Sequence, residues 1–177
     1  PLMLFIALGI KLSGGGPVLF RQQRYGFNNN EFTLFKFRSM ATDLPGGAAD
    51  RLVQVRRDDP RVTAFGRFLR RTSLDELPQL FNVMRGEMAL VGPRPHAVEH
   101  NEEYARIIDR YLVRHKVKPG ITGWAQVNGL RGETSTPQAM RRRVQHDLQY
   151  IENWSFLLDL KILGLTLFTG FVHENAY

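Results

Sequence analysis

Two short segments rich in Val, Phe and Thr predict the strands of the fold. They are PVLFRQQ at residues 17–23 and EFTLFKF at residues 31–37, and β-branched and aromatic side chains favour strands. The residues between them, YGFNNN, are typical of a turn. The pattern therefore predicts two short strands joined by a turn.

Helical segments dominate the chain after these strands. We expect a basic helix or turn near residues 61–71, a helix at 73–85 that ends before Gly86, a long amphipathic helix at 96–118 and a helix at 138–150. Two prolines keep residues 91–95 extended or turning, and the Gly-rich residues 118–130 predict a loop region. The predicted fold class is α/β, of the α+β type, with a small, mostly antiparallel sheet surrounded by helices and no Rossmann glycine fingerprint.

Both ends of the chain are strongly apolar. As a helix, residues 1–12 are roughly 18 Å long, whereas a bilayer core is about 30 Å thick. This piece is therefore a buried core helix, part of a longer membrane helix, or half of a segment that enters and leaves a membrane on one face. Two charges, Asp159 and Lys161, interrupt the second apolar stretch. We expect residues 151–172 to form a helix at the membrane interface or packed on the core, and the two ends to make one membrane-facing surface.

Composition and charge narrow the choice of function. The 177 residues are 43% hydrophobic, enough for one domain with a core, which we assign to residues 13–177. No cysteine is present, which excludes disulfides, thiolate nucleophiles and zinc sites built on cysteine. The net charge of +7 arises entirely before Ser73, where 12 basic residues face five acidic ones. Such a surface attracts phosphates on nucleic acid, anionic lipid or a nucleotide substrate. Charge does not choose among these, and a solvated basic face explains it as well.

An acidic pair lies in the segment RRTSLDELPQL. Ser73 and Glu76 have the spacing of a capping box, which predicts Ser73 as the helix N-cap. Asp75 then lies in the first turn, where free N–H groups and the helix dipole favour anions. A purely structural role explains this pattern too, but Arg70 lies just upstream and Arg94 lies in a Pro-Arg-Pro frame downstream. Carboxylates among arginines suit a site that holds a metal-bound diphosphate.

A second motif competes for a metal role. Residues 96–100, His-Ala-Val-Glu-His, match the H-x-x-E-H pattern of inverted zinc peptidases. The pattern needs a further ligand, and no later residue stands out as one. A surface helix with two solvated histidines explains it equally.

Four strings together carry a resemblance to a known family. They are KLSGGGPVLFRQQRYG, FTLFKFRSM, DDPRVTAFGRFLRRTSLDELPQLFNVMRGEMALVGPRP and VKPGITGWAQVNG, and they cover nearly the whole chain. In this order they resemble the bacterial sugar transferase family, the monotopic phosphoglycosyl transferases that act on polyprenyl phosphate. The last third, with DLQYIENWSFLLDLKIL, looks most like the branch that transfers glucose-1-phosphate to undecaprenyl phosphate.

The resemblance implies a mechanism and a metal. Asp75 matches the nucleophile of the family's Asp-Glu dyad, which attacks the sugar-bearing phosphorus of a UDP-sugar and expels UMP. Undecaprenyl phosphate then attacks the glycosyl-phosphoryl aspartate. The family's metal is Mg²⁺, and Asp75 and Glu76 are the expected catalytic residues and metal ligands. Glucose is the expected sugar, with galactose and N-acetylated sugars as alternatives.

The expected substrate-binding residues fall into two groups. Those near the phosphates are Arg70, Arg94, Pro93, Pro95, Lys36 and Arg38; those on the nucleotide or sugar side are Thr122, Gln126 and Asn128, with Trp124 stacked on a base or at the interface. Alternation along a strand predicts that Lys36 and Arg38 share one face.

The resemblance also implies a location at the cytoplasmic face of the bacterial inner membrane. Residues 1–12 match the C-terminal half of a re-entrant membrane helix, truncated here, with Pro1 at the proline of its central Ser-Pro break. Membrane lipids are then partners, a homodimer is compatible with the apolar ends, and nucleic acid is not a partner. A nucleic-acid-binding module and a non-catalytic membrane scaffold are the alternative functions.

Overall fold

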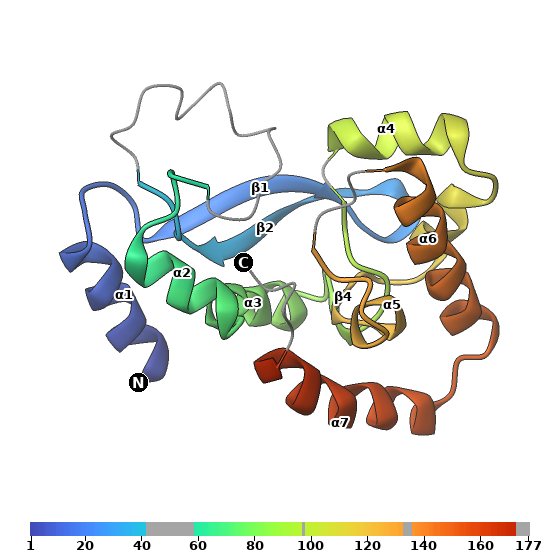
Figure 1. Ribbon diagram of the computed structural model, residues 1–177. Helices are drawn as coiled ribbons and strands as arrows, with labels where there is room; N and C mark the ends of the chain where they lie inside the picture. Colours follow the sequence, from blue (N-terminus) through green and yellow to red (C-terminus); the bar gives the residue numbers. More distant parts are fainter. Residues whose placement is uncertain (42–58, 97, 133–135, 173–177) are drawn as a thin grey trace.

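The computed structural model describes residues 1–41, 59–96, 98–132 and 136–172. An antiparallel hairpin runs through its centre (Figure 1), formed by β1 (Leu19–Tyr25) and β2 (Glu31–Phe37), with Leu19 opposite Phe37. Its turn includes the short 3₁₀ helix η1 (Phe27–Asn29), in which Asn28 and Asn29 have positive φ angles of 52° and 60°. Asparagine tolerates this left-handed region better than most residues. The two predicted strands and their turn are confirmed.

Helices α1 (Leu2–Leu12) and α2 (Ala64–Arg71) pack beside one end of the hairpin. Their shared core contains Ile6, Ile10 and Leu69, together with Phe37 of β2. The basic helix predicted near residues 61–71 is confirmed as α2, which begins where the Thr63 hydroxyl accepts a hydrogen bond from the Gly66 amide.

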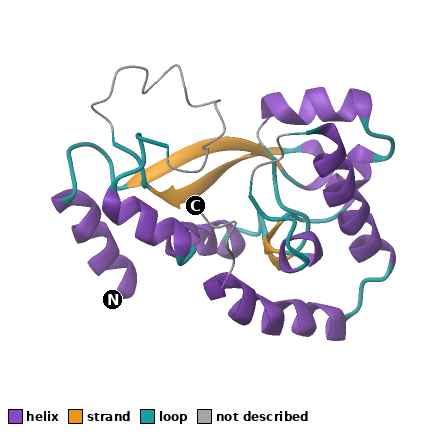
Figure 2. Cartoon of the chain, viewed as in Figure 1, coloured by secondary structure: helices purple, strands orange, loops and turns teal. Residues whose placement is uncertain are grey.

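A second strand pair differs from the prediction. Strand β3 (Ala89–Val91) lies parallel to β4 (Gly120–Thr122), and the short helix α5 (Trp124–Val127) follows. The sequence predicted only a loop at 118–130, since strands of three residues carry no alternating pattern. The mixed α/β class is confirmed, but the sheet is two separate pairs, one antiparallel and one parallel, with helices around them (Figure 2).

The helix predicted at residues 96–118 is shorter than expected. Helix α4 (Val98–Ile107) ends before Arg110, whose φ of 58° is incompatible with a continuing helix, and the 3₁₀ helix η4 (Tyr111–Lys116) follows. The helix predicted at 138–150 is confirmed as α6 (Pro137–Glu152). Helices α4 and α6 and segment η4 share a core of Tyr104, Ile108, Tyr111, Met140 and Val144.

The last helix, α7 (Phe156–Val172), both packs on the core and presents apolar side chains to solvent. Ile162 is fully buried against Val91 and Tyr150. In Figure 1, α7 lies along the bottom of the view and α1 at the lower left. The exposed apolar side chains of these two helices are Leu2, Leu4, Phe5, Leu8, Leu12, Phe156, Leu157, Leu160, Leu167 and Phe168. Within the described residues, no helix has both the length and the apolar character needed to cross a bilayer.

His115 connects η4 to the hairpin turn and makes stability depend on pH. Its Nδ1 donates to the side-chain oxygen of Asn29, and burial, with the nearby Arg114 charge, lowers the pKa of His115 from 6.5 to about 4. The unfolded chain therefore binds this proton at a higher pH than the folded chain does. We expect the free energy of unfolding to fall as the pH drops from 6.5 to 4, with this histidine contributing up to about 1.4 kcal/mol per pH unit.

Denaturant unfolding of wild type and His115→Gln between pH 4 and 7 measures this contribution. Glutamine keeps an amide donor for Asn29 but does not titrate, so the variant should show a shallower pH dependence. Equal slopes for the two proteins would contradict the assignment.

Candidate active site

The acidic pair lies in a tight turn between two helices, not at the start of a regular helix. After α2, Ser73 adopts a left-handed φ of 59°, and Asp75 and Glu76 lie in the 3₁₀ helix η3 (Leu74–Glu76). Helix α3 (Gln79–Met84) begins only after Pro78. The predicted continuous helix at 73–85 and its capping box are therefore wrong. An N-cap needs an extended backbone to aim its oxygen at the N3 amide, and Ser73 instead ends the preceding helix.

Glu76 is the centre of a cluster of cations. Its Oε1 accepts from Lys36 Nζ at 2.9 Å and from Arg94 Nη2 at 2.5 Å, and Arg131 Nη2 lies 3.8 Å from Oε2. Only 8% of the Glu76 side chain is exposed. Burial alone would raise the pKa of Glu76, but Arg94, Lys36 and Arg131 together hold it well below its usual range. Glu76 is therefore a fixed negative charge that gathers three basic side chains.

Asp75 has a different environment, although it is the neighbouring residue. It is buried, and burial raises its pKa above the usual value, against the opposing influence of Lys36, Arg70 and Arg131. Among the described residues, no hydrogen bond or ion pair holds the Asp75 carboxylate. A buried carboxylate with cations nearby but no salt-bridge partner is available to react.

Arg70 has an unpaired buried donor and interacts electrostatically with Asp75. Its Nη1 is buried and has no hydrogen-bond partner among the described residues. Burial lowers the pKa of Arg70 from its usual value, and the charge of Asp75 is the largest opposing influence. Buried guanidinium donors are normally paired, so this one indicates an anionic ligand.

Arg94 lies on a backbone segment that is packed tightly against the second strand pair. A Cβ added to Gly120 would come 2.1 Å from the Gly92 amide nitrogen, so only glycine fits there. The Gly120 amide donates to the Pro93 carbonyl at 3.0 Å. Together with the fixed φ of Pro93 and Pro95, this contact sets the direction in which Arg94 leaves the backbone.

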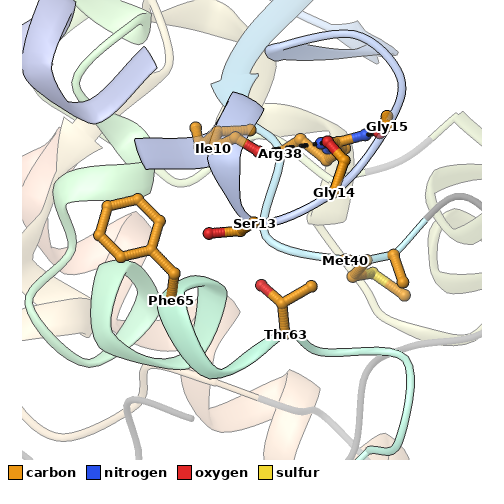
Figure 3. Close-up of a pocket in the computed structure, with 9 residues that line it drawn as sticks. Ile10, Ser13, Gly14, Gly15, Arg38, Met40, Thr63 and Phe65 are labelled. Atoms are coloured by element: carbon orange, nitrogen blue, oxygen red, sulfur yellow. Dashed lines mark hydrogen bonds between the residues drawn. The ribbon is translucent and has the colours of Figure 1, made fainter. Parts of the chain in front are cut away.

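Lys36 in β2 and Arg38, just after the strand, contact different parts of the fold. Lys36 contacts Glu76, whereas Arg38 turns to the end of α1, where it donates to the carbonyls of Ile10, Gly14 and Gly15 (Figure 3). Arg38 lines a cavity there together with Ser13, Met40, Thr63 and Phe65. The structure therefore brings Lys36 to the acidic pair and does not bring Arg38 there.

The residues expected on the nucleotide or sugar side make hydrogen bonds within the fold. Thr122 shares a hydrogen bond with Thr166 of α7, Gln126 donates to the Ile121 carbonyl, and exposed Asn128 donates to the Trp124 carbonyl. The Trp124 ring lies under Lys161 at 5.5 Å. Of the polar side-chain atoms of Thr122, Gln126 and Asn128, Gln126 Oε1 is buried and has no hydrogen-bond partner among the described residues.

Sequence reasoning missed Arg131. It donates to the Ser73 hydroxyl at 2.8 Å and completes the cation cluster around Glu76. It lies two residues beyond the last string that carried the resemblance, in a Gly-rich stretch without a pattern. Its only signal was a basic residue close to that string.

The competing zinc motif gains no support. His96 is buried, and the side chains of Glu99 and His100 lie outside the described residues. Among the side chains that are described, no group of three or more His, Asp or Glu is arranged to hold a metal ion.

Comparison with known proteins identifies the family. The model of the family described as bacterial sugar transferase matches residues 1–173, which is nearly the whole chain. The chain belongs to the bacterial sugar transferase family. The resemblance carried by the four strings is therefore confirmed.

Curated relatives in the bacterial sugar transferase family match the full domain. The chain is 56% identical over its whole length to the UDP-glucose:undecaprenyl-phosphate glucose-1-phosphate transferase of Escherichia coli (strain K12), of which it covers 38%. It is 46% identical, again over its whole length, to the exopolysaccharide production protein PSS of Rhizobium leguminosarum bv. phaseoli, covering 89% of that protein. Over 97% of its length, the chain is 43% identical to the UDP-N-acetylgalactosamine-undecaprenyl-phosphate N-acetylgalactosaminephosphotransferase of Aeromonas hydrophila. The chain covers 40% of that protein. The chain spans only 34% to 38% of the length of the first four curated relatives.

Proposed function

We propose that this chain transfers a hexose-1-phosphate from a UDP-sugar to undecaprenyl phosphate and releases UMP. The observation that carries the proposal is the contrast between the two acidic neighbours. Glu76 is bound by three cations, whereas Asp75 is buried without a salt bridge of its own and interacts electrostatically with Arg70, which has an unpaired donor. A carboxylate without a salt-bridge partner is free to form a covalent bond to phosphorus.

In the first step a carboxylate oxygen of Asp75 attacks the sugar-bearing phosphorus of the donor. An O–P bond forms to Asp75, the bond between that phosphorus and the bridging oxygen breaks, and UMP leaves with the bonding electrons. In this proposal Arg70 and Arg94 neutralise the phosphate oxygens, since guanidinium groups bind phosphate through two parallel hydrogen bonds. Burial of Asp75 strips water from the nucleophile before attack.

In the second step a phosphate oxygen of undecaprenyl phosphate attacks the same phosphorus. The bond between Asp75 and phosphorus breaks, which restores the Asp75 carboxylate, and undecaprenyl-diphospho-hexose leaves. Because the transfer occurs in two steps, the two anionic substrates react at the site one after the other. Each step has a lower barrier than direct transfer between the two substrates.

Asp75 is a more suitable ligand for Mg²⁺ than Glu76. Mg²⁺ commonly takes one or two protein carboxylates, with water and substrate phosphates as its other ligands. Asp75 has no salt-bridge partner among the described residues, whereas both oxygens of Glu76 face cations. When bound, the ion would neutralise the diphosphate against the carboxylate.

Glucose is the sugar that the comparisons favour. The Escherichia coli relative, at 56% identity, is named for UDP-glucose, and the Aeromonas hydrophila relative, at 43%, for UDP-N-acetylgalactosamine. We therefore propose UDP-glucose as the donor. The reaction would be a first membrane step in the synthesis of exopolysaccharide, O-antigen or capsule.

The cytoplasmic face of the bacterial inner membrane is the proposed location. The acceptor lipid resides in a membrane, while UDP-sugars are dissolved in the cytoplasm. The exposed apolar side chains of α1 and α7 provide a surface for such a membrane. We propose that α1 enters the bilayer as part of a re-entrant segment and that α7 lies at the interface.

UMP release tests the proposal directly. The protein in vesicles that contain undecaprenyl phosphate should release UMP from UDP-glucose, faster than from UDP-N-acetylgalactosamine, and only with Mg²⁺ present. Excess EDTA should abolish release, and added Mg²⁺ should restore it. Vesicle binding without UMP release from either donor would instead favour the non-catalytic scaffold, and binding to nucleic acid with a steep salt dependence would favour the nucleic-acid module.

A further inference from the structure

A buried network of polar side chains contacts the backbone of Arg94 and takes no part in the proposed chemistry. Its centre is Arg114 of η4, whose side chain is only 2% exposed. Arg114 Nε donates to Asp147 of α6 at 2.7 Å, Nη1 contacts His96 Nδ1 at 3.0 Å, and Nη2 donates to the Arg94 carbonyl at 2.7 Å. One guanidinium group therefore joins α6, His96 and the backbone of the Pro-Arg-Pro segment.

The protonation state of His96 follows from these contacts. An arginine can only donate, so His96 Nδ1, which lies 3.0 Å from Arg114 Nη1 and 2.6 Å from the Tyr111 hydroxyl, must be the unprotonated, accepting nitrogen. Burial, together with Arg114 and other nearby arginines, lowers the pKa of His96 well below its usual value. His96 is therefore neutral and gives Arg114 a rigid acceptor.

The ion pair between Arg114 and Asp147 is costly to bury. Removing two charges from water costs several kcal/mol per ion, and a well-packed apolar pair often stabilises a fold equally well. What an apolar pair or a lysine lacks is donors in three fixed directions. The geometry uses all three, and one of them ends on the backbone carbonyl of Arg94, the residue whose side chain donates a hydrogen bond to Glu76.

We propose that Arg114, held by Asp147, is a positioning residue that fixes the Arg94 backbone and thereby aims the Arg94 guanidinium at Glu76 and the donor phosphates. The inference rests on the proposed function for the identity of those phosphates. The positioning itself is a property of the folded chain and has its own readout.

Arg114→Lys is the variant that tests the proposal, because it keeps the charge beside Asp147 but cannot form three directed hydrogen bonds. We expect kcat/KM for UDP-glucose to fall by about tenfold to hundredfold, the usual cost of a small misplacement in an active site. In an Arg94→Lys background, which has already lost the guanidinium, the same change should lower kcat/KM less than twofold. The loss of unfolding free energy should be no larger in this background than in wild type, because the guanidinium that Arg114 aims at Glu76 is already absent.

The double-mutant comparison separates positioning from general destabilisation. An equal fall of kcat/KM in both backgrounds would overturn the proposal and leave Arg114 a purely structural residue. Arg110→Lys is the matched control: Arg110 begins the same segment, but its pair with Glu152 is more than half exposed on the arginine side. That variant should keep wild-type activity and stability.

A second readout does not depend on turnover. In a ¹H–¹⁵N spectrum of the full chain, the Arg94 Nε–H resonance, assigned by its loss in Arg94→Lys, should be sharp in wild type and shifted or broadened in Arg114→Lys. An unchanged resonance would overturn the positioning role. If wild type released no UMP from any UDP-sugar while this resonance still moved, the proposed function alone would fail.

Discussion

Replacing Asp75 with asparagine is expected to lower UMP release by about 10³-fold or more. Asparagine has nearly the same shape but no anionic oxygen, so the covalent step cannot proceed, and removal of a nucleophile is among the most damaging changes to an enzyme. Binding of the donor should persist, because Arg70 and Arg94 are unchanged. The expected loss is therefore mainly in kcat, and KM should rise only as far as the loss of the Asp75 ligand weakens Mg²⁺ binding.

Intact-mass spectrometry identifies the reason for the loss. Wild-type protein incubated with UDP-glucose and Mg²⁺ but no acceptor lipid should gain the mass of one hexosyl phosphate, and Asp75→Asn should gain none. Asp109→Asn, a change at an exposed carboxylate, should behave as wild type. Full turnover in Asp75→Asn would end the assignment of Asp75 as nucleophile.

Stability distinguishes this variant from one that simply fails to fold. Burial raises the pKa of Asp75 above its usual value, so at neutral pH ionisation of this group favours the unfolded state. A neutral asparagine removes that penalty. We therefore expect Asp75→Asn to unfold at the same temperature as wild type or higher, although it is inactive.

Local signals explain which parts of the fold were predictable. The strands β1 and β2 and the helices α2 and α6 follow from side-chain type and spacing within each segment. The turn at Ser73 does not, because a capping-box spacing is compatible both with a true N-cap and with the left-handed residue that ends a preceding helix. The parallel pair of β3 and β4 is held by backbone contacts between glycines about 30 residues apart, which no local pattern encodes.

Some residues of the candidate site could likewise be predicted from local sequence, and others could not. The acidic pair, Arg70 and Arg94 were predicted because short strings mark them. Arg131, 55 residues from Glu76, and the support that Arg114 gives to Arg94 arise only when distant segments fold together. Basic residues are common in this sequence, so their type alone could not show which of them surround one buried carboxylate.

Replacing Glu76 with glutamine should cost about 3–5 kcal/mol of unfolding free energy, as expected when one partner of a buried ion pair is removed. Lys36, Arg94 and Arg131 would then share a buried region without the anion that gathers them. Their mutual repulsion should also turn Arg94 away, so that UMP release falls together with stability. The matched control is Glu152→Gln, whose pair with Arg110 is half exposed and should be worth at most about 1 kcal/mol.

The pH dependence of this difference gives a sharper test. The folded-state pKa of Glu76 is held well below 4.5, so the carboxylate contributes its full stability above the unfolded-state pKa and loses it as the pH falls towards the folded-state value. The gap in unfolding free energy between wild type and Glu76→Gln should therefore be constant from pH 6 to 8 and narrow below about 4.5. Denaturant titrations of both variants at several pH values measure this gap. A loss no larger than that of Glu152→Gln would mean that the three cations do not depend on Glu76, and the division of roles between the two acidic neighbours would have to be abandoned.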